Sequence, residues 1–206
     1  MTTDEPTRWG RRVLRFLRSP RRIALVSLSL VLLATLGWLL MQAGHRGVRA
    51  APRTDDVAVG TPVKVDRPAP AFTQPLLSEH GSLSLSRYAD RIVVLNFWAS
   101  NCDACRSEGP ALGRLAASFA NQGVRVVGVD YEDSMGAGAR FARAHGMRYP
   151  SVMDPHGTVG DAYRIFGLPM TFVIVPGQHI RYMVVGKIDV PSFRAVLESL
   201  LRATKA

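Results

Sequence analysis

The hydrophobic pattern of this chain divides it near residue 67, because the two sides of that point follow different periodicities. Beyond residue 67, short continuous runs of β-branched and aromatic residues alternate with longer segments whose apolar residues recur at helical spacing. The short runs predict buried strands at 92–98, 124–130, 170–175 and 180–185. The longer segments predict helices at 103–121, 134–145 and 190–203. A helical turn is expected at 162–166, and a short strand followed by a turn over 83–91.

This order of elements predicts the fold class. Strands that alternate with helices, followed by a hairpin and a closing helix, indicate an α/β protein built as a three-layer α/β/α sandwich. The closing helix has Pro191 in its first turn and an apolar stripe after it, formed by Phe193, Val196, Leu197, Leu200 and Leu201. We therefore expect one folded domain over 67–206.

The part before this domain has a different pattern. Residues 23–44 contain no charged side chain and are numerous enough to cross a bilayer as one helix. Residues 1–22 hold seven arginines against two acidic side chains, and such a basic arm stays on the cytoplasmic side of a membrane. The pattern predicts an N-terminal transmembrane helix, a linker over 45–66 rich in Gly, Pro and charge, and an extracytoplasmic domain.

A cleaved signal peptide is the alternative, since Val48, Arg49 and Ala50 offer a small-residue cleavage pattern. The apolar run is long for a signal peptide, which favours a retained anchor. The same arm explains the formal net charge of +10, because residues 1–22 supply half of the excess. A membrane surface accounts for this distribution better than nucleic acid does.

Both cysteines of the chain, Cys102 and Cys105, stand where the predicted strand 92–98 gives way to a helix. Their spacing allows a disulfide, and the helix start favours the thiolate of Cys102. This pattern indicates a redox-active dithiol. The alternatives are half of a zinc site, an inert structural disulfide, or two buried thiols. Structural zinc needs four ligands, and the chain has no second cysteine pair.

Five segments around the dithiol carry a family resemblance. They are residues 67–72, 84–86, 94–102, 149–154 and 163–172. In this order and spacing they are similar to the motifs of membrane-anchored thiol–disulfide oxidoreductases of the TlpA/ResA type. Those proteins are redoxins related to AhpC/TSA proteins, and they have the thioredoxin fold. The resemblance covers about residues 67–201.

The resemblance implies roles for individual residues. Cys102 would attack a substrate disulfide and Cys105 would resolve the mixed disulfide, while Pro169 would follow a cis peptide bond that faces the dithiol. Trp98 and Leu168 would join Pro169 in binding the substrate. The resemblance implies no cofactor and no metal site.

Two polar residues also have family counterparts. Family members often carry a glutamate near the dithiol at the position of Glu108, where burial would raise its pKa and let it exchange protons with the resolving thiol. The alternative is a solvated glutamate on the helix surface. Asn96 stands where cytoplasmic thioredoxins have a buried aspartate, and an amide cannot relay a proton as a carboxylate does.

The chain departs from the family within the motif. Asp103 makes the motif Cys-Asp-Ala-Cys, and Asn101 takes the place where relatives often have tryptophan. These departures leave the identity of the substrate open. A peroxidase is not expected, because Ala99 and Leu95 stand where the peroxiredoxin signature requires Thr or Ser and an earlier Pro.

We therefore predict an extracytoplasmic, membrane-anchored thiol–disulfide oxidoreductase that reduces disulfides of exported proteins. By resemblance, apocytochrome c is a candidate substrate, and an unidentified membrane protein would supply the electrons. The alternatives are a disulfide oxidant or isomerase, or a Cu(I)-binding chaperone that uses the same thiolates. Four methionines could assist copper binding, although core packing is their commoner use: Met135, Met147, Met153 and Met170.

Overall fold

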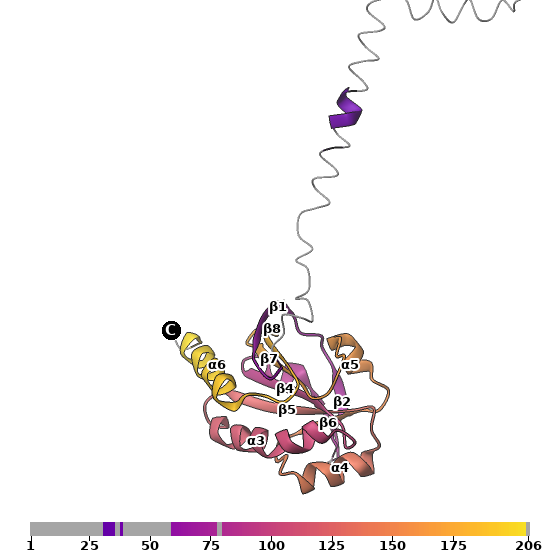
Figure 1. The fold of residues 1–206 in the computed structure, drawn as a ribbon, viewed down its shortest axis with the longest axis vertical. Helices are drawn as coiled ribbons and strands as arrows, with labels where there is room; N and C mark the ends of the chain where they lie inside the picture. Colours follow the sequence, from indigo (N-terminus) through magenta and orange to yellow (C-terminus); the bar gives the residue numbers. More distant parts are fainter. Residues whose placement is uncertain (1–30, 36–37, 39–58, 78–79, 205–206) are drawn as a thin grey trace, which may run out of the picture. The chain divides into compact units, whose positions relative to one another are not determined.

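The computed structural model describes residues 31–35, 38, 59–77 and 80–204 (Figure 1). Residues 31–35 and 38 are helical. The predicted basic arm 1–22, most of the predicted anchor 23–44 and most of the predicted linker 45–66 lie outside the described residues. Within the part of the chain that the structure describes, no helix is long and apolar enough to cross a bilayer.

The folded domain is built on one sheet of six strands with the order β1-β8-β7-β4-β5-β6. Strands β4, β5 and β6 are parallel, and the remaining neighbours are antiparallel. The strands are β1 (Val63–Pro68), β4 (Ile92–Trp98), β5 (Val124–Tyr131), β6 (Ser151–Asp154), β7 (Met170–Val175) and β8 (His179–Val185). A separate two-stranded ribbon pairs β2 (Thr73–Pro75) with β3 (Ser82–Ser84).

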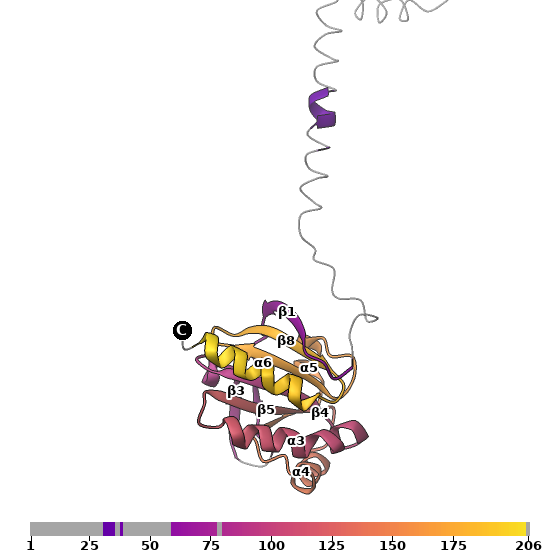
Figure 2. The same ribbon diagram turned by 60° about the vertical axis from the view of Figure 1, so that its left-hand side comes forward.

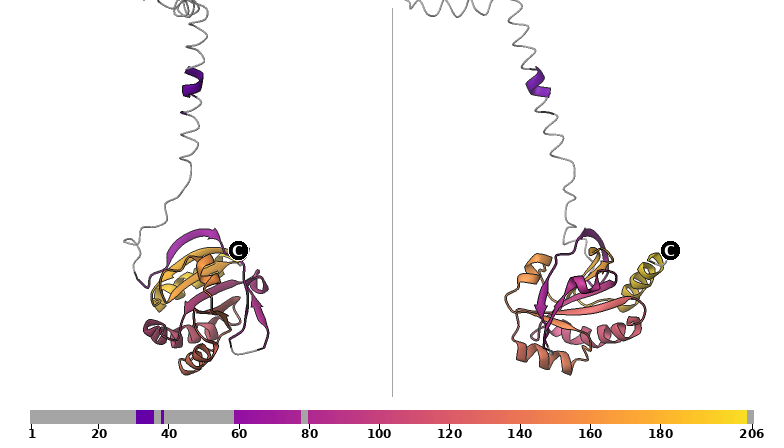
Figure 3. Two further views of the ribbon diagram at one scale, coloured as in Figure 1. Left: turned by 90° about the vertical axis from the view of Figure 1, so that its right-hand side faces the viewer. Right: turned by 180° about the vertical axis from the view of Figure 1, so that it is seen from behind.

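Helices cover both faces of this sheet. They are η2 (Leu85–Tyr88, a 3₁₀ helix), α3 (Asp103–Phe119), α4 (Met135–Ala144), α5 (Thr158–Tyr163) and α6 (Val190–Ala203). Helices α3, α4 and α6 lie on one side, with α3 and α6 next to each other (Figure 2), and α5 lies across the sheet from α3 and α4 (Figure 3). This confirms the predicted three-layer α/β sandwich.

The central strand β4 is buried along its whole length, and its side chains alternate between two cores. Val94 and Trp98 belong to the core under α3, α4 and α6. Leu95 and Phe97 belong to the core on the opposite face, where α5 packs. This alternation follows from the two-residue period of a strand. Burial on both faces explains why the sequence of β4 reads as one continuous apolar run.

The sheet begins earlier than the sequence predicted. The sequence predicts a linker for residues 63–66, yet they form most of β1 at the sheet edge and pair with β8. Every second residue of β1 is exposed, including Lys64 and Asp66. Edge strands tolerate such charges and a terminal proline like Pro68, so the sequence of these residues does not show the apolar pattern of a buried strand.

Strand β6, which holds only four residues, is not predicted from the sequence either.

Two further elements differ from prediction. The short strand expected over 83–87 is β3 followed at once by η2. The helical turn expected at 162–166 is α5, which starts and ends earlier. Helix α5 begins there because the buried carboxylate of Asp154 accepts hydrogen bonds from the amides of Val159 and Gly160 at 3.0 and 2.9 Å.

Candidate active site

A disulfide joins Cys102 and Cys105 where β4 passes into α3. The S–S distance is 2.07 Å and the two Cα atoms are 5.2 Å apart. Cys102 is the N-cap residue of α3 in extended conformation, and the backbone N–H of Cys105 donates to its Sγ at 3.1 Å. After reduction, this N–H and the positive end of the helix dipole favour the thiolate of Cys102.

The two sulfurs differ in access to solvent. Cys102 is partly exposed, whereas Cys105 is 1% exposed and belongs to the core under α3. A partner protein can therefore reach Cys102 directly and cannot reach Cys105. This difference agrees with Cys102 as the attacking cysteine and Cys105 as the resolving one.

Glu108 lies one helical turn beyond Cys105 on α3 and is 1% exposed. Its Oε2 accepts a hydrogen bond from Asn96 Nδ2 at 3.0 Å, and its Oε1 accepts one from the amide of Ile188 at 2.8 Å. The alternative of a solvated glutamate is therefore wrong. The spacing on α3 did not distinguish the two cases, because the partners come from β4 and from the segment before α6.

Burial raises the pKa of Glu108 to about 7. The hydrogen bonds from Ile188 and Asn96 and the charge of Lys187 oppose this shift, because each stabilises the carboxylate. An acid with a pKa near the ambient pH is effective in proton exchange. Glu108 is thus suited to take the proton of the buried Cys105 thiol when that thiol becomes a nucleophile.

Asn96 connects three elements at this site. Besides its bond to Glu108, its Nδ2 donates to Thr171 Oγ1 in β7 at 3.0 Å. Both Asn96 and Thr171 are buried, and their strands pair at these two positions. The neutral amide stands opposite the carboxylate as a donor, so Asn96 orients Glu108 rather than titrating itself.

The peptide bond between Leu168 and Pro169 is cis, as the resemblance implied. Strand β7 starts at the next residue and pairs with β4 so that Met170 lies opposite Phe97. Pro169 therefore lies at the same end of the sheet as Trp98 and the loop into Cys102. Leu168 is partly exposed and Pro169 is buried.

Trp98 does not fit the expectation that it contacts substrate. Its side chain is fully buried and stacks on Phe141 of α4, with ring centroids 5.4 Å apart. The residue before the active-site loop thus fixes α4 against the sheet. For Leu168 and Pro169, substrate contact stays a prediction.

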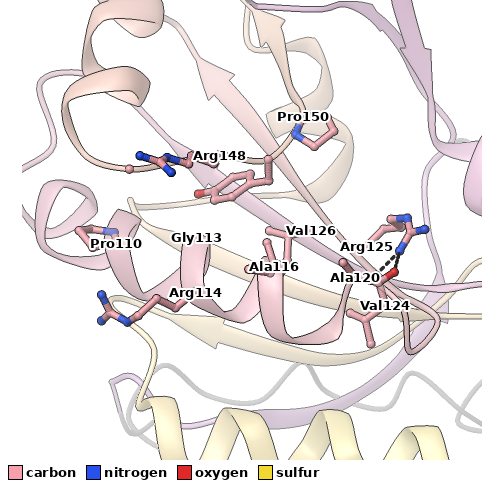
Figure 4. Close-up of a pocket in the computed structure, with 13 residues that line it drawn as sticks. Pro110, Gly113, Arg114, Ala116, Ala120, Val124, Arg125, Val126, Arg148 and Pro150 are labelled. Atoms are coloured by element: carbon pink, nitrogen blue, oxygen red, sulfur yellow. Dashed lines mark hydrogen bonds between the residues drawn. The ribbon is translucent and has the colours of Figure 1, made fainter.

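Two other features lie outside this site. A groove of about 560 Å³ runs along α3 from Pro110 to Ala120 against residues 146–150, and its lining contains neither cysteine (Figure 4). Of the four methionines considered for copper, Met147 and Met170 are buried in the cores. Within the described ranges, no group of three or more His, Cys, Asp or Glu residues could hold a metal ion.

Two acidic residues beside the dithiol are not predicted from the sequence. Asp133 accepts a hydrogen bond from the amide of Ser100, in the loop that leads into Cys102, at 2.8 Å. Asp130 is buried at the end of β5, beside Trp98 in the sheet register. Asp130 ends the predicted strand 124–130, and Asp133 looks like an ordinary turn residue. Their position at the carboxyl end of a predicted strand was the available signal, since the carboxyl ends of parallel strands meet at one edge.

An exposed sulfur at a helix start, backed by a buried second sulfur, can exchange disulfides. The layered sheet that presents this pair is the thioredoxin fold, so the class of protein is a thiol–disulfide oxidoreductase of that fold. The family follows from comparison: the chain belongs to the AhpC/TSA family, whose model matches residues 65–183.

Individual relatives agree with this class. The chain is 31% identical over 158 residues to the thiol-disulfide oxidoreductase ResA of Bacillus subtilis, covering 76% of this chain and 80% of that protein. It is 33% identical over 127 residues to the thiol:disulfide interchange protein DsbE of Allochromatium vinosum, covering 61% of this chain and 68% of that protein. A solved structure of a DsbF homologue from Corynebacterium diphtheriae is 25% identical with a TM-score of 0.63. The match covers 73% of this chain and 96% of that chain. These relatives confirm the predicted resemblance; the membrane anchor stays a prediction.

The raised pKa of Glu108 predicts a pH-dependent stability. In the folded state this pKa is about 7, above the ordinary value of 4.5. Between these pH values the folded protein holds a proton that the unfolded chain has lost, so the wild type loses stability as the pH rises. Relative to Glu108→Gln, this loss should be at most about 3 kcal/mol, since one pKa unit corresponds to ~1.36 kcal/mol.

Urea unfolding of the disulfide-bonded proteins at several pH values measures this difference. Glu198→Gln removes a carboxylate from an exposed position on α6 and serves as the charge-matched control. Its stability should follow that of the wild type at every pH. A constant difference between Glu108→Gln and the wild type would show that Glu108 titrates like a solvated acid.

Proposed function

We propose that this thiol–disulfide oxidoreductase acts outside the cytoplasmic membrane and reduces disulfides of exported proteins. The observation that carries the disulfide-exchange activity is the arrangement of Cys102 and Cys105. The attacking sulfur is accessible at the start of α3, and the resolving sulfur is buried one turn from Glu108. Such a site can complete exchange with a substrate without leaving a mixed disulfide behind.

The reaction proceeds in two exchanges. The thiolate of Cys102 attacks a substrate disulfide, forms a mixed disulfide and releases one substrate sulfur as a thiolate. Glu108 accepts the proton of Cys105, whose thiolate then attacks Sγ of Cys102. The second substrate sulfur leaves, the Cys102–Cys105 disulfide forms, and two electrons have passed to the substrate. A dithiol partner must then reduce the protein for the next cycle.

The local charges support a reducing dithiol. Asp103 follows Cys102 directly, and its negative charge disfavours a neighbouring thiolate. Arg106 pairs with Asp103 at 3.4 Å, but both side chains are more than half exposed. The ion pair therefore cancels little of the effect of the Asp103 charge on the thiolate. A less stabilised thiolate means a less favoured dithiol and a lower potential than that of an oxidant such as DsbA.

The proposed location and partners rest on the sequence and the relatives. The uncharged run 23–44 behind an arginine-rich arm supports a single-pass anchor with the domain on the outer face. Similarity to proteins named ResA and DsbE supports exported, cysteine-containing proteins as substrates. By the TlpA/ResA resemblance, apocytochrome c is the specific candidate, with a membrane protein as electron donor.

Replacing each cysteine should separate the two exchange steps. Cys102→Ser should abolish exchange, because the accessible nucleophile is lost. Cys105→Ser should accumulate mixed disulfides with partners, because nothing resolves them. Alkylation kinetics of the reduced wild type at neutral pH give an independent check. Faster reaction at Cys105 than at Cys102 would reverse the assigned roles.

The midpoint potential of the dithiol tests the direction of electron flow. We expect a value nearer to that of thioredoxin, about −270 mV, than to that of DsbA, about −120 mV. Equilibration against glutathione or dithiothreitol buffers measures it. A midpoint above about −180 mV, the value for protein disulfide isomerase, would replace the reductase with an oxidant or isomerase.

Asp103→Asn should raise this potential by a few tens of millivolts at most, where about 30 mV is a tenfold change in equilibrium constant. Asp90→Asn is the matched control, since Asp90 is also exposed and paired with a neighbouring arginine, at 3.7 Å. Its potential should equal that of the wild type. Equal shifts in both variants would show that net charge, not the position beside Cys102, sets the effect.

The anchor can be tested in cell fractions. The full chain should stay in the membrane fraction after washing with alkaline carbonate, and a variant that lacks residues 1–44 should not. A membrane-impermeant thiol reagent should label reduced Cys102 in intact cells if the domain lies outside. A mature chain that starts at Ala51 would replace the anchor with a cleaved signal peptide.

A further inference from the structure

The loop that carries Cys102 is held by a carboxylate from the turn that follows the neighbouring strand β5. Oδ2 of Asp133 accepts a hydrogen bond from the amide of Ser100 at 2.8 Å. Oδ1 of the same side chain accepts one from the amide of Ser134 at 2.7 Å. Ser134 is the N-cap residue of α4. One carboxylate therefore ties the active-site loop to the start of α4.

A second carboxyl group lies behind the first. Asp130 is 1% exposed and packs against the backbone of α4. A Cβ atom added to Gly138 of α4 would collide with Oδ2 of Asp130, so only glycine fits there. Oδ1 of Asp130 is buried and has no hydrogen-bonding partner among the described residues.

The carboxyl groups of Asp130 and Asp133 interact with each other. Two interacting carboxyl groups in a buried site avoid having two like charges in contact when one of them keeps its proton. Asp133 already accepts two amide hydrogen bonds, which favour its charged form. The proton therefore belongs to Asp130, the more deeply buried of the two.

The pKa values agree with this placement of the proton. Burial, followed by the charge of Asp133 and the hydrogen bond with it, raises the pKa of Asp130 to about 8. Burial opposes ionisation of Asp133 as well, but the hydrogen bonds from Ser100, Ser134 and Asp130 outweigh it and lower its pKa. The two groups titrate as a coupled pair.

No other charge of the surrounding elements faces this pair closely. Asp130 lies beside Trp98 of β4, Met153 of β6 and Gly138 of α4, and none of these three is charged. The nearest titratable residues on these elements and loops point elsewhere. Glu132 lies near Gly157, His145 packs on Phe141, Asp103 pairs with Arg106, and Arg140 on α4 is exposed.

We propose that Asp130 and Asp133 are positioning residues for the dithiol, in which a neutral Asp130 donates to Asp133 and Asp133 in turn holds the Ser100 amide. Loss of the Asp130 proton places two negative charges in contact in a buried site. The carboxylate of Asp133 then moves away from Asp130, and its hold on the loop before Cys102 weakens. This proton is separate from that of Glu108, which faces the resolving cysteine.

The disulfide-bonded protein allows a direct test, because neither cysteine titrates in that state. Carbon-detected NMR follows the side-chain carboxyl carbon of Asp130 and the amide nitrogen of Ser100 as the pH rises. In the wild type both signals should change together with a midpoint of about 8. In Asp130→Asn, which keeps a neutral donor of the same shape, the Ser100 signal should not titrate in this range.

Glu132→Gln is the matched control, because this exposed carboxylate lies between the two residues in sequence. The Ser100 titration should be unchanged in it. Asp133→Asn, as a second variant, should remove the Ser100 titration even if Asp130→Asn fails to fold. A Ser100 signal that titrates equally in the wild type and in either Asp130→Asn or Asp133→Asn would overturn the proposal.

The rate of disulfide reduction by dithiothreitol tests the effect on chemistry. The ratio of the wild-type rate to the Asp130→Asn rate cancels the titration of the reagent. This ratio should be constant below about pH 7 and should change by about threefold or more by about pH 9. A purely structural role would change both rates by one factor at every pH, and such a flat ratio would overturn the proposal.

Discussion

The buried carboxyl group of Glu108 is the point on which the active site depends. It receives one hydrogen bond from Asn96 in β4 and one from the backbone of Ile188 before α6, while it belongs to α3 itself. Three elements distant in sequence are thus held together by one acid. A buried donor left without its partner costs roughly 1–3 kcal/mol, so the Glu108 side chain stabilises the fold at the place where it lies behind the dithiol.

The topology explains why the acids gather around the dithiol. Strands β4 and β5 are parallel neighbours, so their carboxyl ends, the loop with Ser100 and the turn with Asp133 meet at one edge. The start of α3 lies at the same edge and supplies its dipole to Cys102. Glu108 and the Asp130–Asp133 pair then form two separate proton-holding sites, one behind the resolving cysteine and one behind the loop of the attacking cysteine.

The division between the two cysteines follows from the same geometry. As the N-cap residue of α3, Cys102 precedes the first helical turn and remains accessible, whereas Cys105 lies within the first turn on the face that packs on the sheet. The exposed positions on either side of Cys102, Asn101 and Asp103, are where the chain departs from its relatives. The interior thus supports the exchange reaction shared with the family, and the exposed positions set the surface that a partner meets.

The sequence by itself determined the layered α/β fold and the position of the cysteine pair at a helix start, because periodicity, spacing and helix starts are local properties. It also gave the limits of α6 and β7 as the structure has them. It did not determine the edge strand β1, which depends on pairing with β8, or the limits of α5, which depend on hydrogen bonds to the buried carboxylate of Asp154 in β6. Nor could it decide whether Glu108 is solvated or buried, or bring Asp130 and Asp133 to the loop of Cys102. Those outcomes depend on contacts between separate strands and helices, and only the tertiary structure brings these together.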